Sequence, residues 1–116
     1  MSPAEEAAAF GSAFADGIDC LVRLRSLRES PAIVNAEDLE TWNAALNGLQ
    51  ETLETAKSGH TGARQIVTSY RVSDALIHSV HNLRTALSSV APDAPFPTSV
   101  LDYADAAYTE LANSLP

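Results

Sequence analysis

Residues 35–59 read NAEDLETWNAALNGLQETLETAKSG and predict one complete amphipathic helix with a signal at each of its ends. Asn35 is a good N-cap, and two acids follow in the first turn, where they favour the positive end of the helix dipole. Lys57 and Gly59 mark the other end, as a last-turn cation and a left-handed cap. The apolar residues between these signals alternate steps of three and four, as in a helix that packs along one seam: Leu39, Trp42, Leu46, Leu49 and Leu53.

The chain before this helix predicts another one, from Ser2 to about Arg28. Ser2, Pro3 and Glu5 stand as the N-cap, the first-turn proline and the acid of a capping box. The helix should stop near Arg28, because Pro31 disfavours helical geometry in the residue before it. Its apolar stripe recurs every three or four residues: Phe10, Phe14, Gly17, Ile18, Leu21 and Leu24.

The region from 62 to 90 carries a helical stripe that changes phase. Val67 falls nearly opposite the rest when the pattern is extended backwards, and such a slip indicates a kink or a break. Ser73 is suited to start a fresh helix as its N-cap. We therefore expect a short helix over 62–70 and a long one over 73–90, with a single kinked helix as the alternative. The stripe itself is Val72, Leu76, Val80, Leu83, Leu87 and Val90.

Three prolines in residues 91–97 make this segment a connector, after which Thr98 or Ser99 should cap a last helix. Nothing in the chain alternates with a period of two between turn signals, so we expect no strands. Short connections between amphipathic helices favour antiparallel neighbours. The predicted fold is all-α: an antiparallel up-down-up-down four-helix bundle over residues 1–116, with the third helix kinked or broken near residues 70–73.

The composition excludes several classes of protein. The 116 residues suit one globular domain, and no window approaches the ~18 apolar residues of a membrane span. Fifteen acids against seven bases give a net charge of −8, which argues against direct binding of nucleic-acid phosphates. The single cysteine, Cys20, excludes an internal disulfide framework. Since the first residues are acidic rather than basic, unlike a secretory signal, we expect a cytoplasmic protein that does not bind membranes.

The second predicted helix offers the best surface for an interaction, although a solvated face that keeps the protein soluble is the simpler interpretation. Its acids favour a partner with a basic surface. The end of the bundle where the first and third connections meet is a second candidate. Partner-binding residues from these two places, with one exposed aromatic of the last helix, are Glu37, Glu40, Glu51, Glu54, Ile33, Val34, Phe96 and Tyr103.

Two other clusters carry weaker hypotheses. Arg23, Arg25 and Arg28 could hold an anion or an acidic partner, but cations in the last turns of a helix are explained by the helix dipole alone. Asp74, His78 and His81 lie at i, i+4 and i+7, a spacing at which carboxylate and imidazole can bind a metal. We favour a solvated polar face there, because the three residues point away from the apolar stripe.

The sequence therefore predicts a small acidic protein-interaction module, such as a regulator, an inhibitor, an adaptor or an immunity-type protein. No nucleophile–base pair is visible, so the balance is against an enzyme, and no cofactor is expected. The partner would be another protein. A homodimer is an alternative, because a short chain buries only a modest core. A metal- or small-ligand-binding bundle that uses Asp74, His78 and His81 is the second hypothesis.

Overall fold

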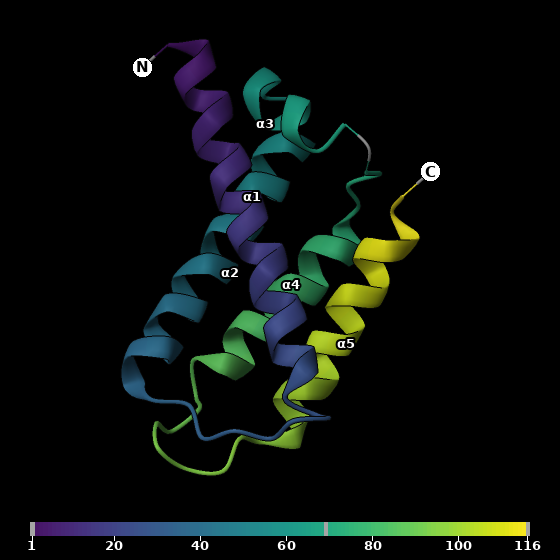
Figure 1. Cartoon of the computed structure of the whole chain (residues 1–116). Helices are drawn as coiled ribbons and strands as arrows, with labels where there is room; N and C mark the ends of the chain where they lie inside the picture. The colour runs from purple at the N-terminus through teal and green to yellow at the C-terminus, as the bar shows by residue number, and fades with distance from the viewer. Residues whose placement is uncertain (1, 69, 116) are drawn as a thin grey trace.

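The computed structural model describes residues 2–68 and 70–115, and all of its regular structure is helical (Figure 1). The all-α prediction is confirmed, and five helices pack together, because the third helix of the expected bundle is broken into a short and a long one. Their bounds are α1 Pro3–Ser26, α2 Ala36–Lys57, α3 Thr61–Ile66, α4 Asp74–Leu87 and α5 Thr98–Asn113.

The extra helix arises where the apolar stripe changes phase. The chain forms the short helix α3 and then the long helix α4, rather than one kinked helix. Ser73 caps α4 as expected: its hydroxyl accepts a hydrogen bond from the backbone N–H of Leu76 at 3.2 Å. The separation is wider than predicted, because α3 already ends at Ile66 and α4 begins at Asp74. Helix α4 also ends three residues earlier than expected, at Leu87, before the proline-rich connector.

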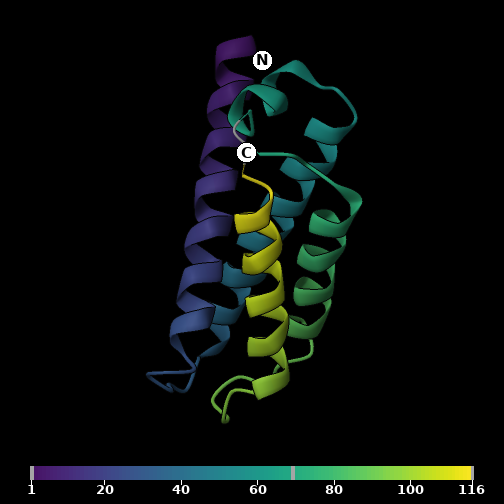
Figure 2. The same ribbon diagram turned by 90° about the vertical axis from the view of Figure 1, so that its right-hand side faces the viewer.

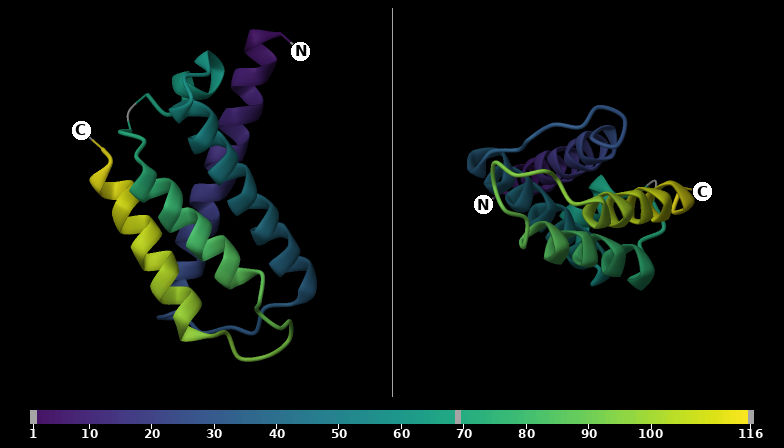
Figure 3. Two further views of the ribbon diagram at one scale, coloured as in Figure 1. Left: turned by 180° about the vertical axis from the view of Figure 1, so that it is seen from behind. Right: turned by 90° about the horizontal axis from the view of Figure 1, so that it is seen from below.

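The four long helices contact one another in a closed ring: α1 with α2, α2 with α4, α4 with α5, and α5 with α1. In Figure 1 the chain descends along α1 and α4 and ascends along α2 and α5, and both ends of the chain lie at the upper end. The view from the side and the views from behind and below show the same arrangement (Figures 2 and 3). Helix α3 lies beside the upper part of α1 and α2, which are the helices it contacts.

Each end of the molecule is tied by one backbone hydrogen bond between distant segments. At the lower end, the N–H of Asp93 donates to the carbonyl of Val34 at 2.9 Å, so the α1–α2 and α4–α5 connections lie together. At the upper end, the N–H of Arg71 donates to the carbonyl of Ser114 at 2.7 Å and joins the α3–α4 connection to the end of α5. Buried backbone groups require such partners, so these bonds help to fix both ends.

The interior is built mainly from leucines of the four long helices, which remove apolar surface from water. Two helices approach closely at Gly17, where a Cβ would overlap the Cβ of Leu49 and lie 3.0 Å from its Cγ. Gly17 therefore allows the contact between α1 and α2 that its place in the stripe predicted. The largest fully buried side chains include Leu21, Leu24, Leu46, Leu49, Leu53, Leu76, Leu83 and Leu87.

The helix ends follow the sequence signals in most places. Ser2 accepts from the backbone N–H of Glu5 at 3.2 Å, and Asn35 accepts from that of Asp38 at 2.8 Å. The expected cap of the last helix is wrong: α5 begins at Thr98 with Pro97 as its N-cap, and no side chain bonds to the cap. Helix α1 ends at Ser26, two residues before the expected end. In the part of the chain that the structure describes, no helix is long and apolar enough to cross a membrane.

Candidate functional site

Four exposed acids form one flank of α2, which we call the acidic flank: Glu37, Glu40, Glu51 and Glu54. Their spacing places them within one face of the helix, in two pairs about 16 Å apart along its axis. Within residues 2–68 and 70–115, none of them makes an ion pair with a basic side chain. Their negative charge is therefore directed at solvent.

A hydrogen-bonded chain that the sequence did not reveal joins this flank to α4. The guanidinium of Arg84 donates to the Oε1 of Gln50 at 2.8 Å. The Nε2 of Gln50 then donates to the Oε1 of Glu54 at 2.6 Å. Such a relay orients the Glu54 carboxylate and leaves the other three acids of the flank unaffected. Neither the spacing of Gln50 nor that of Arg84 signals it, because the contact depends on how α2 and α4 are rotated.

The candidate residues at the lower end of the molecule differ in their exposure to solvent. Ile33 is 67% exposed, whereas Val34 is 5% exposed and belongs to the core. The expectation that Val34 offers a contact surface is therefore corrected: the residue next to the α2 cap turns inward. Phe96 is half-buried and meets Trp42 edge to face, with ring centroids 6.4 Å apart. Tyr103 is 44% exposed on α5, in line with its place off the apolar stripe.

An apolar pocket of about 370 Å³ opens beside Ile33 and Phe96. The α1–α2 connection, the α4–α5 connection and the ends of two helices form its walls. This pocket gives the lower end a hollow that the sequence did not predict, since its walls come from segments about sixty residues apart. Its apolar lining is Leu27, Pro31, Ala32, Ile33, Pro95, Phe96 and Leu101.

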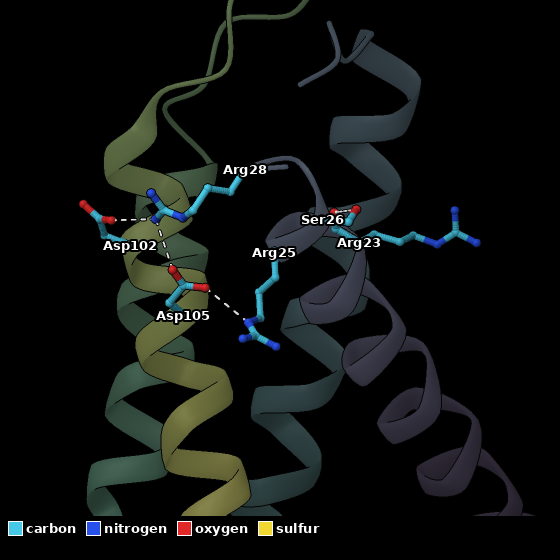
Figure 4. A network of polar contacts seen from close by, with 6 residues as sticks. All are labelled: Arg23, Arg25, Ser26, Arg28, Asp102 and Asp105. Carbon is cyan, nitrogen blue, oxygen red and sulfur yellow. Dashed lines mark hydrogen bonds and ion pairs between the residues drawn. The ribbon is translucent and has the colours of Figure 1, made fainter. Parts of the chain in front are cut away.

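The arginine cluster is neutralised inside the chain (Figure 4). Arg28 donates to the carboxylates of Asp102 at 2.7 Å and Asp105 at 3.1 Å. Arg25 donates to the other oxygen of Asp105 at 3.2 Å, and its guanidinium lies 3.9 Å from the centre of the Tyr108 ring. The acids of α5 thus occupy the place that was considered for an anion or an acidic partner.

The contacts of Arg28 also shift its pKa. The hydrogen bond that Arg28 donates to Asp102 is the largest cause that raises the pKa of Arg28, and burial opposes it. Arg23 points away from the other two arginines in Figure 4 and pairs with Asp19 on its own helix at 2.8 Å. Arg23 thus forms an i,i+4 ion pair within α1, whereas Arg25 and Arg28 join the end of α1 to α5.

The histidine face does not assemble a metal site. Asp74, His78 and His81 are exposed and line one shallow, open depression with Gln50. Asp74 is instead the ion-pair partner of Lys57. Across residues 2–68 and 70–115, no group of three or more histidine, cysteine or acidic side chains is placed to hold a metal ion.

Cys20 is a buried side chain of α1, 2% exposed. Its Sγ donates to the carbonyl of Trp42 at a distance of 3.8 Å. The pKa of its thiol is raised to about 12, mainly by burial and also by the negative charge of Asp19, while Arg23 acts in the opposite direction. A thiol with this pKa stays protonated at neutral pH, so Cys20 is no nucleophile.

The chain was compared with protein families, curated proteins and solved structures. The chain matches no protein-family model, and neither the curated proteins nor the solved structures contain a significant match.

Proposed function

We propose that this chain is a non-enzymatic protein-interaction module whose acidic flank binds a basic surface of another protein. The observation that carries the proposal is the exposed negative charge of α2, where Glu37, Glu40 and Glu51 face solvent without a basic partner among the described residues. Complementary charge is what steers and orients an association between proteins.

The distribution of ion pairs supports this choice over the other faces. Arg23, Arg25, Arg28 and Lys57 each pair with an aspartate, and all of these aspartates lie outside the acidic flank. Most of the basic charge therefore compensates acids on α1, α4 and α5. Because these four pairs are neutral, the net charge of −8 comes from the remaining residues, which include the four acids of the acidic flank.

We also propose that the four long helices form an up-down-up-down bundle, with α3 added at one end, and that this bundle is the scaffold for the acidic flank. The closed ring of contacts among α1, α2, α4 and α5 supports it. A capped, regular helix holds the side chains of the flank at fixed spacing, which favours recognition by a partner. Regulator, inhibitor, adaptor and immunity-type roles all fit such a surface. The proposed location is the cytoplasm, where disulfides are rare and a lone thiol is ordinary.

The second hypothesis, a small-ligand or metal site, has less support. Its three residues share a depression, but Asp74 is paired with Lys57 and the depression is open to solvent. An enzyme would need an activated nucleophile or an acid–base pair, and the buried, protonated thiol of Cys20 supplies neither.

The experiment is a purification of the tagged protein from its own host, followed by identification of polypeptides retained in stoichiometric amount. The test variant is Glu40→Lys with Glu51→Lys, two exposed flank acids outside the Gln50–Glu54 hydrogen bond. The matched control is Glu5→Lys with Glu29→Lys, which replaces two exposed acids and changes the net charge equally but lies off α2.

We expect one basic partner to be retained by the wild type and by the control, and lost from the flank variant. Retention by all three proteins would remove the acidic flank as the binding surface. Equal loss from both variants would show that total charge, rather than this flank, controls the association. A homodimer as the only complex would replace the proposed partner with a second copy.

A further inference from the structure

A groove of about 590 Å³ runs between α1 and α2, beside the acidic flank but separate from it. Its floor consists of small side chains and one indole, all buried or half-buried: Ala13, Cys20, Trp42, Ala45 and Gly48. It extends over eleven residues of each helix, 13–23 and 38–48, which is about 15 Å along the axis. That length matches roughly three turns of another helix.

The helices lie close together beneath the groove, and its small residues explain why it is hollow. A Cβ on Gly48 would lie 3.3 Å from the Cβ of Ala13, at the upper end of the groove. No long side chain therefore fills the space above the seam. The Trp42 indole meets Phe96 edge to face, and it is the one half-buried aromatic ring that lines the groove. Such a surface can receive apolar side chains of a partner.

The rim of this groove is acidic on both sides. Asp16 and Asp19 project from α1 and Asp38 from α2, and all three are exposed. Arg23 is the one cation that lines the groove, and it is paired with Asp19 at 2.8 Å. Asp16 and Asp38 make no ion pair with any side chain that the structure describes. The rim therefore has a net negative charge on both walls.

We propose that this groove binds an amphipathic helical segment of a partner protein, with apolar residues on one face and lysine or arginine on the flanking positions. The apolar floor would receive the apolar face, and the carboxylates of Asp16 and Asp38 would receive the basic residues from opposite walls. A second copy of this chain fits the groove poorly, because a chain of net charge −8 would bring further acids to an acidic rim.

The proposal rests on the proposed function in assigning a basic partner, but it uses different residues. The groove can therefore prove not to bind a peptide while the acidic flank still binds its partner, and the reverse outcome is equally distinguishable. Trp42 makes a direct test feasible, since it is the only tryptophan of the chain and lines the groove. Any ligand that enters should change its fluorescence.

The probe is a synthetic peptide of about 14 residues, long enough to span the groove as a helix. It carries leucine and alanine on one face, lysine on the other, and no aromatic residue. Two control peptides accompany it: a scrambled sequence of the same composition, and a version with glutamate in place of lysine. Trp42 emission is followed during titration at about 20 mM salt, where ion pairs at the rim are least screened.

The test variant is Asp16→Asn with Asp38→Asn, and the matched control is Glu40→Gln with Glu51→Gln on the acidic flank. Both remove two exposed carboxylates. Thr41→Lys, which adds a cation at another exposed position of the rim, gives an independent variant. Circular dichroism and the melting temperature establish that each variant is folded before its affinity is compared.

We expect the lysine peptide to produce a saturable change in Trp42 emission with the wild type and with the flank control. The rim variants should bind about tenfold more weakly, because each loses or opposes charge at the contact. The proposal is overturned by an unsaturable response, by equal binding of the scrambled peptide, or by equal weakening in the rim and flank variants. A dimer in sedimentation that changes Trp42 emission with protein concentration would assign the groove to a second copy.

Discussion

Gly17 of α1 lies directly against Leu49 of α2, with no room between them for a Cβ at the glycine. Glycine in the middle of a helix lowers its stability relative to alanine. Its presence at a buried position of a 24-residue helix is explained by this contact. The close approach brings α1 and α2 together along the seam beside the proposed groove.

Gly17→Ala should therefore destabilise the protein, even though alanine has the higher helix propensity. Overpacking of a core contact costs about 1–3 kcal/mol, which exceeds the gain of about 1 kcal/mol from removing a glycine. Chemical denaturation measures the free energy of unfolding. Gly48→Ala is the matched control on the facing helix, where the new Cβ would lie 3.3 Å from that of Ala13 and less has to move. A Gly17→Ala protein as stable as the wild type would contradict the close contact.

Asp105→Asn should weaken the attachment of α5 to α1 more than Asp102→Asn does. Asp105 accepts from both Arg25 and Arg28, whereas Asp102 accepts from Arg28 alone and its side chain is 74% exposed. Exposed ion pairs contribute little, so we expect each variant to lower the melting temperature by no more than a few degrees. Melting curves at low and high salt provide the measurement. If the two variants behaved identically, Asp105 would not be the shared acceptor of both arginines.

Cys20 should make the stability of the fold decrease at alkaline pH. Its pKa is raised from an ordinary value of 9.0 to about 12, so between these values the unfolded chain loses this proton while the folded chain keeps it. The free energy of unfolding should then fall as pH rises through that window, and this contribution is fully present below pH 9. Urea denaturation between pH 8 and 11 measures the slope. The Cys20→Ala protein is the control, and a slope as steep as that of the wild type would show that other groups cause the decline.

Phe96→Ala should loosen the lower end of the molecule and expose Trp42. The two rings meet edge to face and Phe96 is packed against the core. Loss of a large aromatic from a half-buried site should cost about 2 kcal/mol, less than the value for a full core position. Trp42 emission should shift to longer wavelength. Ile33→Ala, at a residue that is 67% exposed, should leave both the emission and the stability almost unchanged.

Local signals in the sequence were sufficient for the helices themselves. Asn35, Ser2 and Ser73 each act as the cap that their neighbours suggested, because capping depends on residues within one turn. The stripe of α2 likewise predicts which leucines are buried. The break between α3 and α4 was visible as the phase change at Val67, although its width was not.

Contacts between helices were not predictable from these signals. The pairing of Arg25 and Arg28 with Asp105 joins residues 80 and 77 positions apart, and it depends on the rotation of α5 about its axis. The burial of Val34 was not predictable either, because it follows from the path of a connection rather than from any periodicity. The groove between α1 and α2 likewise depends on how the two helices pack.

The central claim is that α2 presents an acidic surface that binds a basic protein. The most direct test is native mass spectrometry of the protein purified gently from its own host, with the Glu40→Lys/Glu51→Lys variant alongside. We expect a complex with one other polypeptide of basic composition for the wild type, and the chain alone for the variant. A wild-type chain that carries only a metal or small ligand, or that is found solely as a monomer or homodimer, would contradict it.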